Sequence, residues 1–75
     1  MAWFKLEKYE SSITDLSRYL KVYDDDAEAY FYRGLSNFYL INKLEAHHDF
    51  LKANKLGYQK AEDMLDKYFK GYHVL

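Results

Sequence analysis

Residues 27–57 read AEAYFYRGLSNFYLINKLEAHHDFLKANKLG, and this stretch decides the fold. Apolar and aromatic residues recur at spacings of three and four from Ala27 to Leu40 and again from Leu44 to Leu56. This is the spacing of one face of an α-helix. A short polar break separates the two segments, and Gly57 follows the second as a left-handed helix stop. The stretch therefore predicts a helical hairpin.

The chain also matches itself at an offset of 34 residues. A fixed period of this length is a signature of helical repeat proteins. Apolar positions stay in register across the offset, as in Leu16 with Phe50 and Val22 with Leu56. The identical pairs are Phe4 with Phe38, Leu6 with Leu40, Asp15 with Asp49, Lys21 with Lys55, Ala27 with Ala61 and Glu28 with Glu62.

These residues resemble the tetratricopeptide repeat (TPR) family, whose pattern is W-x2-L-G-x2-Y, then A-x3-F, then P. Tyr30 stands for the Trp, Gly34 for the Gly, Ala46 and Phe50 for the A-x3-F pair, and Ala53 for a small residue one turn later. The resemblance implies an all-α fold in which antiparallel helical hairpins stack as a short, TPR-like, right-handed solenoid. It also implies that Gly34 and Ala46 lie where the two helices cross closely.

Three positions depart from the family pattern. Arg33 replaces the Leu, Asn37 replaces the aromatic residue, and Tyr58 replaces the closing Pro. Because Asn37 removes an aromatic ring from the helix pair, we expect a softer spot under the groove at this position.

The resemblance divides the chain into one TPR-like domain over residues 1–75. A partial repeat covers residues 1–26, a full repeat residues 27–58, and a terminal half repeat or capping helix residues 59–75. The chain is thus expected to begin inside a repeat. We favour a short separate stub over Met1–Leu6; the alternative is that these residues run straight into the next helix, because LEKY holds no Gly, Pro or Asn to force a turn.

Two more helices are expected on either side of the hairpin, over Tyr9–Tyr23 and Tyr58–Tyr72. The acidic run Asp24-Asp25-Asp26 lies before the hairpin and lacks the alternating ligands and central Gly of a calcium loop. Asp25 or Asp26 is therefore expected to cap the next helix, whose positive end favours negative charge.

His47 and His48 do not form a predicted metal or catalytic site. Adjacent helical residues diverge by about 100°, so the two rings cannot face one ion as an i, i+4 pair would. Both side chains are expected to face solvent. With no nucleophile and base identified, we predict no catalytic residues, no metal and no cofactor, and the protein is not expected to be an enzyme.

Composition limits the remaining classes. The chain has 75 residues, 9 Tyr, 5 Phe, 1 Trp and no Cys, so a disulfide framework is excluded. Its formal net charge of -1, with both signs interspersed, gives no broad positive field for nucleic acid or anionic lipid. No apolar run approaches the ~18 residues of a membrane span. We expect a cytoplasmic protein.

The TPR resemblance implies a scaffold module that binds another protein or peptide on its concave face. The central helix is apolar on several sides, which is typical of a helix contacted by more than one neighbour. The expected partner-binding residues are Phe31, Tyr32, Leu35, Phe38, Tyr39, Leu65 and Phe69. The alternative is a self-associating structural module, a homodimer or other homo-oligomer with no separate ligand, or a designed or excised repeat fragment.

Overall fold

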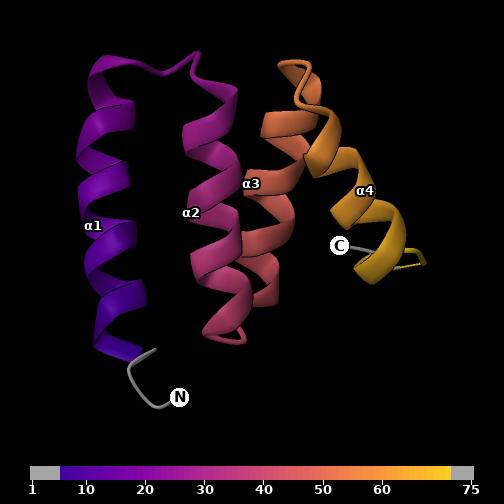
Figure 1. Cartoon of the computed structure of the whole chain (residues 1–75), viewed down its shortest axis with the longest axis horizontal. Helices are drawn as coiled ribbons and strands as arrows, with labels where there is room; N and C mark the ends of the chain where they lie inside the picture. The colour runs from indigo at the N-terminus through magenta and orange to yellow at the C-terminus, as the bar shows by residue number, and fades with distance from the viewer. Residues whose placement is uncertain (1–5, 72–75) are drawn as a thin grey trace.

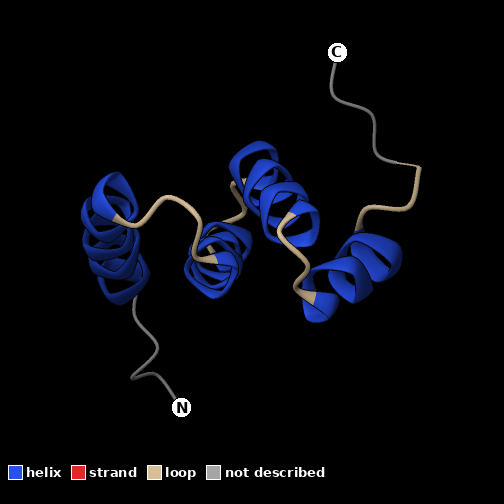
Figure 2. Cartoon of the chain, turned by 90° about the horizontal axis from the view of Figure 1, so that it is seen from above, coloured by secondary structure: helices blue, strands red, loops and turns tan. Residues whose placement is uncertain are grey.

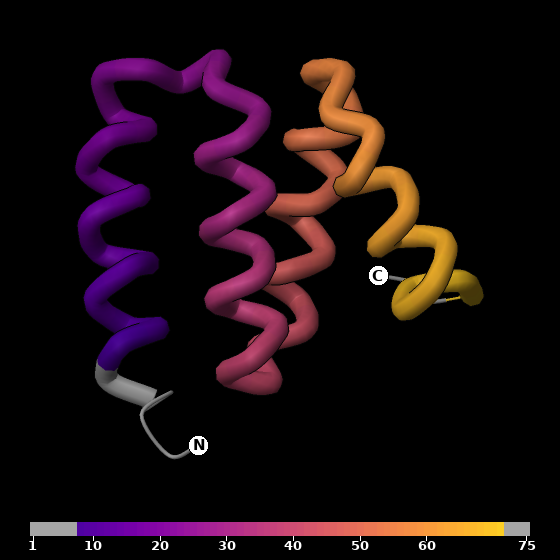
Figure 3. Tube along the Cα trace, viewed as in Figure 1, coloured from indigo at the N-terminus to yellow at the C-terminus, as the bar shows by residue number. Residues whose placement is uncertain are grey.

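The computed structural model describes residues 6–71, whose secondary structure consists of four helices without a strand. The helices are α1 (Leu6–Val22), α2 (Ala27–Tyr39), α3 (Lys43–Lys55) and α4 (Gln59–Tyr68). Successive helices run in opposite directions (Figure 1), and the trace in Figure 3 shows that the connections between them are short. The prediction of an all-α chain is confirmed.

The central helix α2 packs against α1 on one side and α3 on the other, and α4 packs against α3. Seen from above, α3 is set back from the line that joins α2 and α4 (Figure 2). Both α2 and α4 therefore meet the same side of α3. Among the described helices, α2 is the main neighbour of α1.

The start of α2 is fixed by a side-chain cap. One carboxylate oxygen of Asp26 accepts a hydrogen bond from the Ala29 N–H at 3.2 Å. The other oxygen accepts from the Tyr19 hydroxyl at 2.5 Å, which ties the end of α1 to the start of α2. The Tyr19 hydrogen bond, followed by that from Ala29, lowers the pKa of Asp26. The prediction that the acidic run caps this helix is confirmed.

Both α2 and α3 end in the same backbone motif, in which two N–H groups beyond the helix bond back to its last turn. After α3, Gly57 has φ +99° and Tyr58 N–H donates to the Ala53 carbonyl at 3.0 Å. After α2, the equivalent position is Ile41, with φ +60°, and Asn42 N–H donates to the Asn37 carbonyl at 2.8 Å. The predicted left-handed stop at Gly57 is confirmed. Ile41 occupies a conformation that suits Gly far better than a β-branched residue.

Two predicted boundaries differ from the structure. Helix α1 begins at Leu6 rather than Tyr9, so residues 6–8 continue the helix and the favoured stub does not include Leu6; the remainder of that segment lies outside the described residues. Helix α4 ends at Tyr68 rather than Tyr72, because Phe69 turns into the core and Gly71 takes φ +82°. Residues 72–75 lie outside the described residues.

The core lies where α2, α3 and α4 meet. Phe50 is its largest fully buried side chain, and Phe31 and Phe69 pack beside it. A Cβ atom built on Gly34 would lie 2.9 Å from two carbons of the Phe50 ring. Such a distance is too short for ordinary packing, so a residue larger than Gly would force α2 away from α3. Three alanines of α3 and α4 are also fully buried in this core: Ala46, Ala53 and Ala61.

We predict that Ile41→Gly stabilises the protein by about 1 kcal/mol. The left-handed region costs an L-residue roughly 1–2 kcal/mol, which Gly avoids. Part of this gain is offset because Gly raises the conformational entropy of the unfolded chain. Little apolar burial is lost, since Ile41 is 82% exposed. Urea unfolding measures the change. The matched converse, Gly57→Ile, should destabilise by a similar amount, because nothing lies within 4 Å of its new Cβ and only the backbone conformation differs. If Ile41→Gly leaves stability unchanged or lowers it, Ile41 is not strained.

Candidate partner-binding groove

An open groove of about 340 Å³ lies between α1 and α2. Its walls are mostly apolar or aromatic. From α1 come Lys8, Tyr9, Ser12 and Leu16, and from α2 come Tyr32, Leu35, Ser36 and Tyr39. The rings of Tyr9 and Tyr39 stack at 5.2 Å between centroids and join the two walls at one end.

The groove continues into a second hollow of about 500 Å³, because Leu16 and Tyr32 line both. This end is acidic. Asp15, Asp26 and Glu28 line it, and no basic side chain does. The combined groove thus runs from an apolar, tyrosine-rich section to a section bordered by carboxylates.

The structure brings three of the predicted binding residues together in this groove. Tyr32 is 46% exposed, Tyr39 is 55% exposed, and Leu35 is half-buried between them. All three lie on the side of α2 that faces α1. They are available to a partner without any rearrangement of the core.

The other predicted binding residues lie on the opposite side, where α4 covers α2. Phe31 is 7% exposed, and its ring is tilted against those of Phe50 and Tyr58, at centroid distances of 5.6 and 4.9 Å. Phe69 is 5% exposed and lies 6.1 Å from the ring of Phe38. Phe31 and Phe69 are therefore core residues. Phe38 and Leu65 are half-buried beside them.

The residues of the α1 wall were not among the predicted binding residues, because their spacing indicates only one face of a helix. A signal was nevertheless present. Ser12, Leu16 and Tyr19 precede Ala46, Phe50 and Ala53 by the repeat offset. Tyr19, which is much larger than Ala53, is 41% exposed and lines the acidic end.

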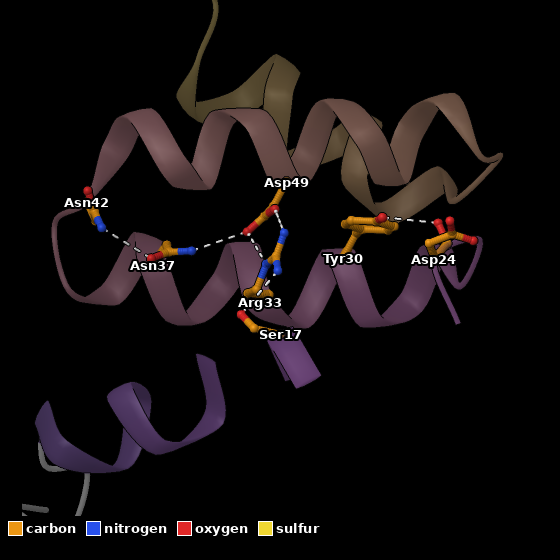
Figure 4. A network of polar contacts seen from close by, with 7 residues as sticks. All are labelled: Ser17, Asp24, Tyr30, Arg33, Asn37, Asn42 and Asp49. Atoms are coloured by element: carbon orange, nitrogen blue, oxygen red, sulfur yellow. Dashed lines mark hydrogen bonds and ion pairs between the residues drawn. The ribbon is translucent and has the colours of Figure 1, made fainter. Parts of the chain in front are cut away.

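A partly buried ion pair joins α2 to α3 (Figure 4). The Arg33 guanidinium donates from Nε to Asp49 Oδ2 at 3.0 Å and from Nη2 to Oδ1 at 2.8 Å. Its Nη1 donates to the Ser17 hydroxyl at 3.2 Å, so the same side chain also reaches α1. Two parallel bonds of this kind define geometry as well as adding energy. The hydrogen bond to Asp49 raises the pKa of Arg33 despite partial burial.

Asn37 belongs to this network, which corrects the expectation of a softer spot. Its Nδ2 donates to Asp49 Oδ2 at 3.2 Å, and its Oδ1 accepts from Asn42 Nδ2 at 3.3 Å. Asn37 is buried, and its polar atoms replace the packing of an aromatic ring with hydrogen bonds. The departures at Arg33 and Asn37 therefore compensate each other through Asp49.

The two adjacent histidines have different environments. His48 is exposed, as expected, but His47 is half-buried and its ring lies 5.2 Å from that of Phe69. The expectation that His47 faces solvent is wrong, because α4 and Phe69 pack on this side of α3. Burial, and secondly the charge of His48, lower the pKa of His47.

Comparisons with models of known protein families, with curated proteins and with solved structures find no match. In the described part of the chain, no helix is long and apolar enough to cross a membrane. Nor do three or more His, Asp or Glu side chains within it gather in a metal-binding arrangement.

We predict that Asp49→Ala destabilises the protein by roughly 3 kcal/mol, because it leaves the Arg33 cation without its buried partner. The side chains are 24% and 6% exposed respectively, so water compensates little. The double variant Arg33→Leu/Asp49→Leu should recover much of the lost stability, because it leaves no unpaired charge. Denaturant unfolding of the two single Leu variants and the double variant gives the coupling energy. Strictly additive effects would mean that the pair contributes nothing specific.

We predict that the protein loses stability as the pH falls below 6.5, the ordinary pKa of a histidine side chain. The folded state keeps His47 neutral to a lower pH, so in that window the unfolded chain binds more protons. The contribution of neutral His47 to the free energy of unfolding is complete above about pH 6.5, and it is lost as the pH falls through the lowered pKa of His47 in the folded state. Thermal melts across this range measure it. His47→Gln should flatten the slope, whereas His48→Gln should keep most of it; equal slopes in all three proteins would contradict the assignment.

Proposed function

We propose that this protein is a non-enzymatic protein–protein interaction module that binds an apolar segment of another protein in the groove between α1 and α2. The carrying observation is the open, tyrosine-rich groove itself. Tyr32 and Tyr39 are large side chains with few rotatable bonds, and aromatic anchors of this type dominate many interfaces. A groove between two helices is a common seat for a helix or peptide.

The proposal extends to architecture. The 34-residue offset, and a crossing at Gly34 that tolerates no Cβ against Phe50, support a short TPR-like right-handed solenoid of stacked hairpins. In such a chain each hairpin offers its inner helix to a ligand. The partner is then another protein, rather than nucleic acid or a membrane, because the surface carries charges of both signs.

We predict that Tyr32→Asp/Tyr39→Asp weakens the binding of groove ligands at least about tenfold, since aromatic anchors each contribute more than about 1 kcal/mol. Ligands are selected from a displayed library of linear peptides against the wild-type chain, and fluorescence anisotropy measures their affinities. Both tyrosines are about half exposed, so helicity and melting temperature should change little.

The matched control is Leu51→Asp, an equally exposed apolar residue on α3 that does not line the groove. This variant should bind as the wild type does. The proposal would be overturned if no ligand were recovered, or if the groove variant bound the selected ligands with the same affinity as the wild type.

Self-association is the second candidate, and a specific observation favours it. Leu44, Leu51 and Leu56 all expose about two fifths of their surface on or just beyond α3. A second copy could cover these residues by forming a symmetric dimer. Sedimentation at increasing concentration distinguishes the two, because a dimer has twice the 9.1 kDa mass of one chain.

A further inference from the structure

The α1 wall of the groove repeats the side of α3 that is covered by α2. Both helices present a small or polar residue, an Asp, a large apolar residue and a final residue at the same spacing. The four α1 positions are Ser12, Asp15, Leu16 and Tyr19, and the repeat offset places them at Ala46, Asp49, Phe50 and Ala53 of α3.

On α3, these four residues belong to the surface on which α2 packs. Ala46, Phe50 and Ala53 are fully buried, and Asp49 is almost so. Two consecutive residues of α2 make the defining contacts. Arg33 donates two hydrogen bonds to Asp49, and Gly34 lies so close to Phe50 that a Cβ atom on it would be 2.9 Å from two ring carbons.

On α1, the corresponding residues line the open groove. Leu16 is half-buried and borders both parts of the groove, whereas Asp15 is exposed at its acidic end. Within residues 8–71, Asp15 makes no hydrogen bond or ion pair with another side chain. The Asp15 carboxylate, which corresponds to Asp49, is therefore accessible to an arginine, whereas Arg33 of α2 bonds the α3 carboxylate.

We propose that the groove seats one helix of a separate protein, antiparallel to α1, which presents an arginine to Asp15 and a small residue to Leu16. This rests on the proposed function and names the chemistry of its partner. The model for the contact is the pairing of Arg33 with Asp49 and of Gly34 with Phe50. Helices α2 and α3 also run in opposite directions (Figure 1), which sets the orientation.

Charge complementarity selects this occupant over a purely apolar one. Asp26 is engaged with Tyr19 and Ala29, but Asp15 and Glu28 add negative charge to the same end of the groove, where no lining side chain is basic. An arginine can pair with a carboxylate through two parallel bonds, which a lysine cannot.

A second copy of this chain does not offer such a helix from its folded surface. Its arginines are Arg18 and Arg33. Arg33 precedes a Gly, but both residues are committed to α3 in each protomer. Arg18 is followed by the large Tyr19. The occupant is therefore a helix from another protein.

The probe for this proposal is the sequence of α2 itself, because α2 is the helix that packs on the equivalent surface of α3. A peptide of residues 27–39, N-acetylated, C-amidated and fluorescently labelled, is titrated with the full chain and followed by anisotropy. Its affinity will be modest, since an isolated helix of 13 residues is marginal in water. A second peptide carries Arg33→Glu.

We expect Asp15→Arg in the protein to weaken binding of the first peptide about tenfold, the effect of losing a charge-assisted bidentate pair. The same substitution should favour the Arg33→Glu peptide over the first by a similar factor. Glu10→Arg is the charge-matched control, because Glu10 is exposed on α1 and does not line the groove. It should leave both affinities unchanged.

Three outcomes overturn the proposal while leaving the proposed function intact. The peptide binds independently of Asp15, Asp15→Arg and Glu10→Arg weaken it equally, or it does not bind although library-selected peptides occupy the groove. Exchange of the peptide for the protein's own α2 would give the first result. If neither the α2 peptide nor any library peptide binds, the proposed function itself fails.

Discussion

The close crossing of α2 and α3 at Gly34 is the constraint on which the remaining structure depends. A Cβ at this position would lie 2.9 Å from the Phe50 ring, so only the absence of a side chain allows the two helices to approach as they do. That approach places Arg33 within bonding distance of Asp49. It also leaves the other side of Phe50 free for Phe69, whose ring lies 5.8 Å away and brings the end of α4 into the core.

The ion pair at this crossing contributes geometry more than stability. Removing two charges from water is costly, and the attraction between them repays that cost only when the remaining donors and acceptors are satisfied. Here Asn37 and Ser17 supply the additional bonds. Because the guanidinium meets one helix through a bidentate pair and the other through a hydroxyl, the network sets the register of α2 against α3 and α1 together.

Two helices with one pattern have different surroundings, and this difference creates the candidate site. Helix α3 is covered by α2 and α4, so Ala46, Phe50 and Ala53 belong to the core. Among the described helices, α1 packs mainly against α2, and the residues at equivalent positions line a groove. The same chemistry that holds the fold together on α3, a carboxylate next to an apolar surface, is therefore available for recognition on α1.

The sequence alone determined the order of the helices, a cap at Asp25 or Asp26, the stop at Gly57 and the need for a small residue at Gly34, because each depends on local backbone chemistry or on helical periodicity. Tertiary structure decided which apolar side of α2 is buried. Periodicity shows that Phe31 and Tyr32 are both on apolar sides of the helix, but only the position of α4 makes the first a core residue and the second a groove residue. It likewise decided the fate of His47 and the end of α4 at Tyr68, since a half-buried ring and a side chain turned into the core are products of packing between helices. Burial is a property of neighbours in space, and the order of residues along one helix does not specify them.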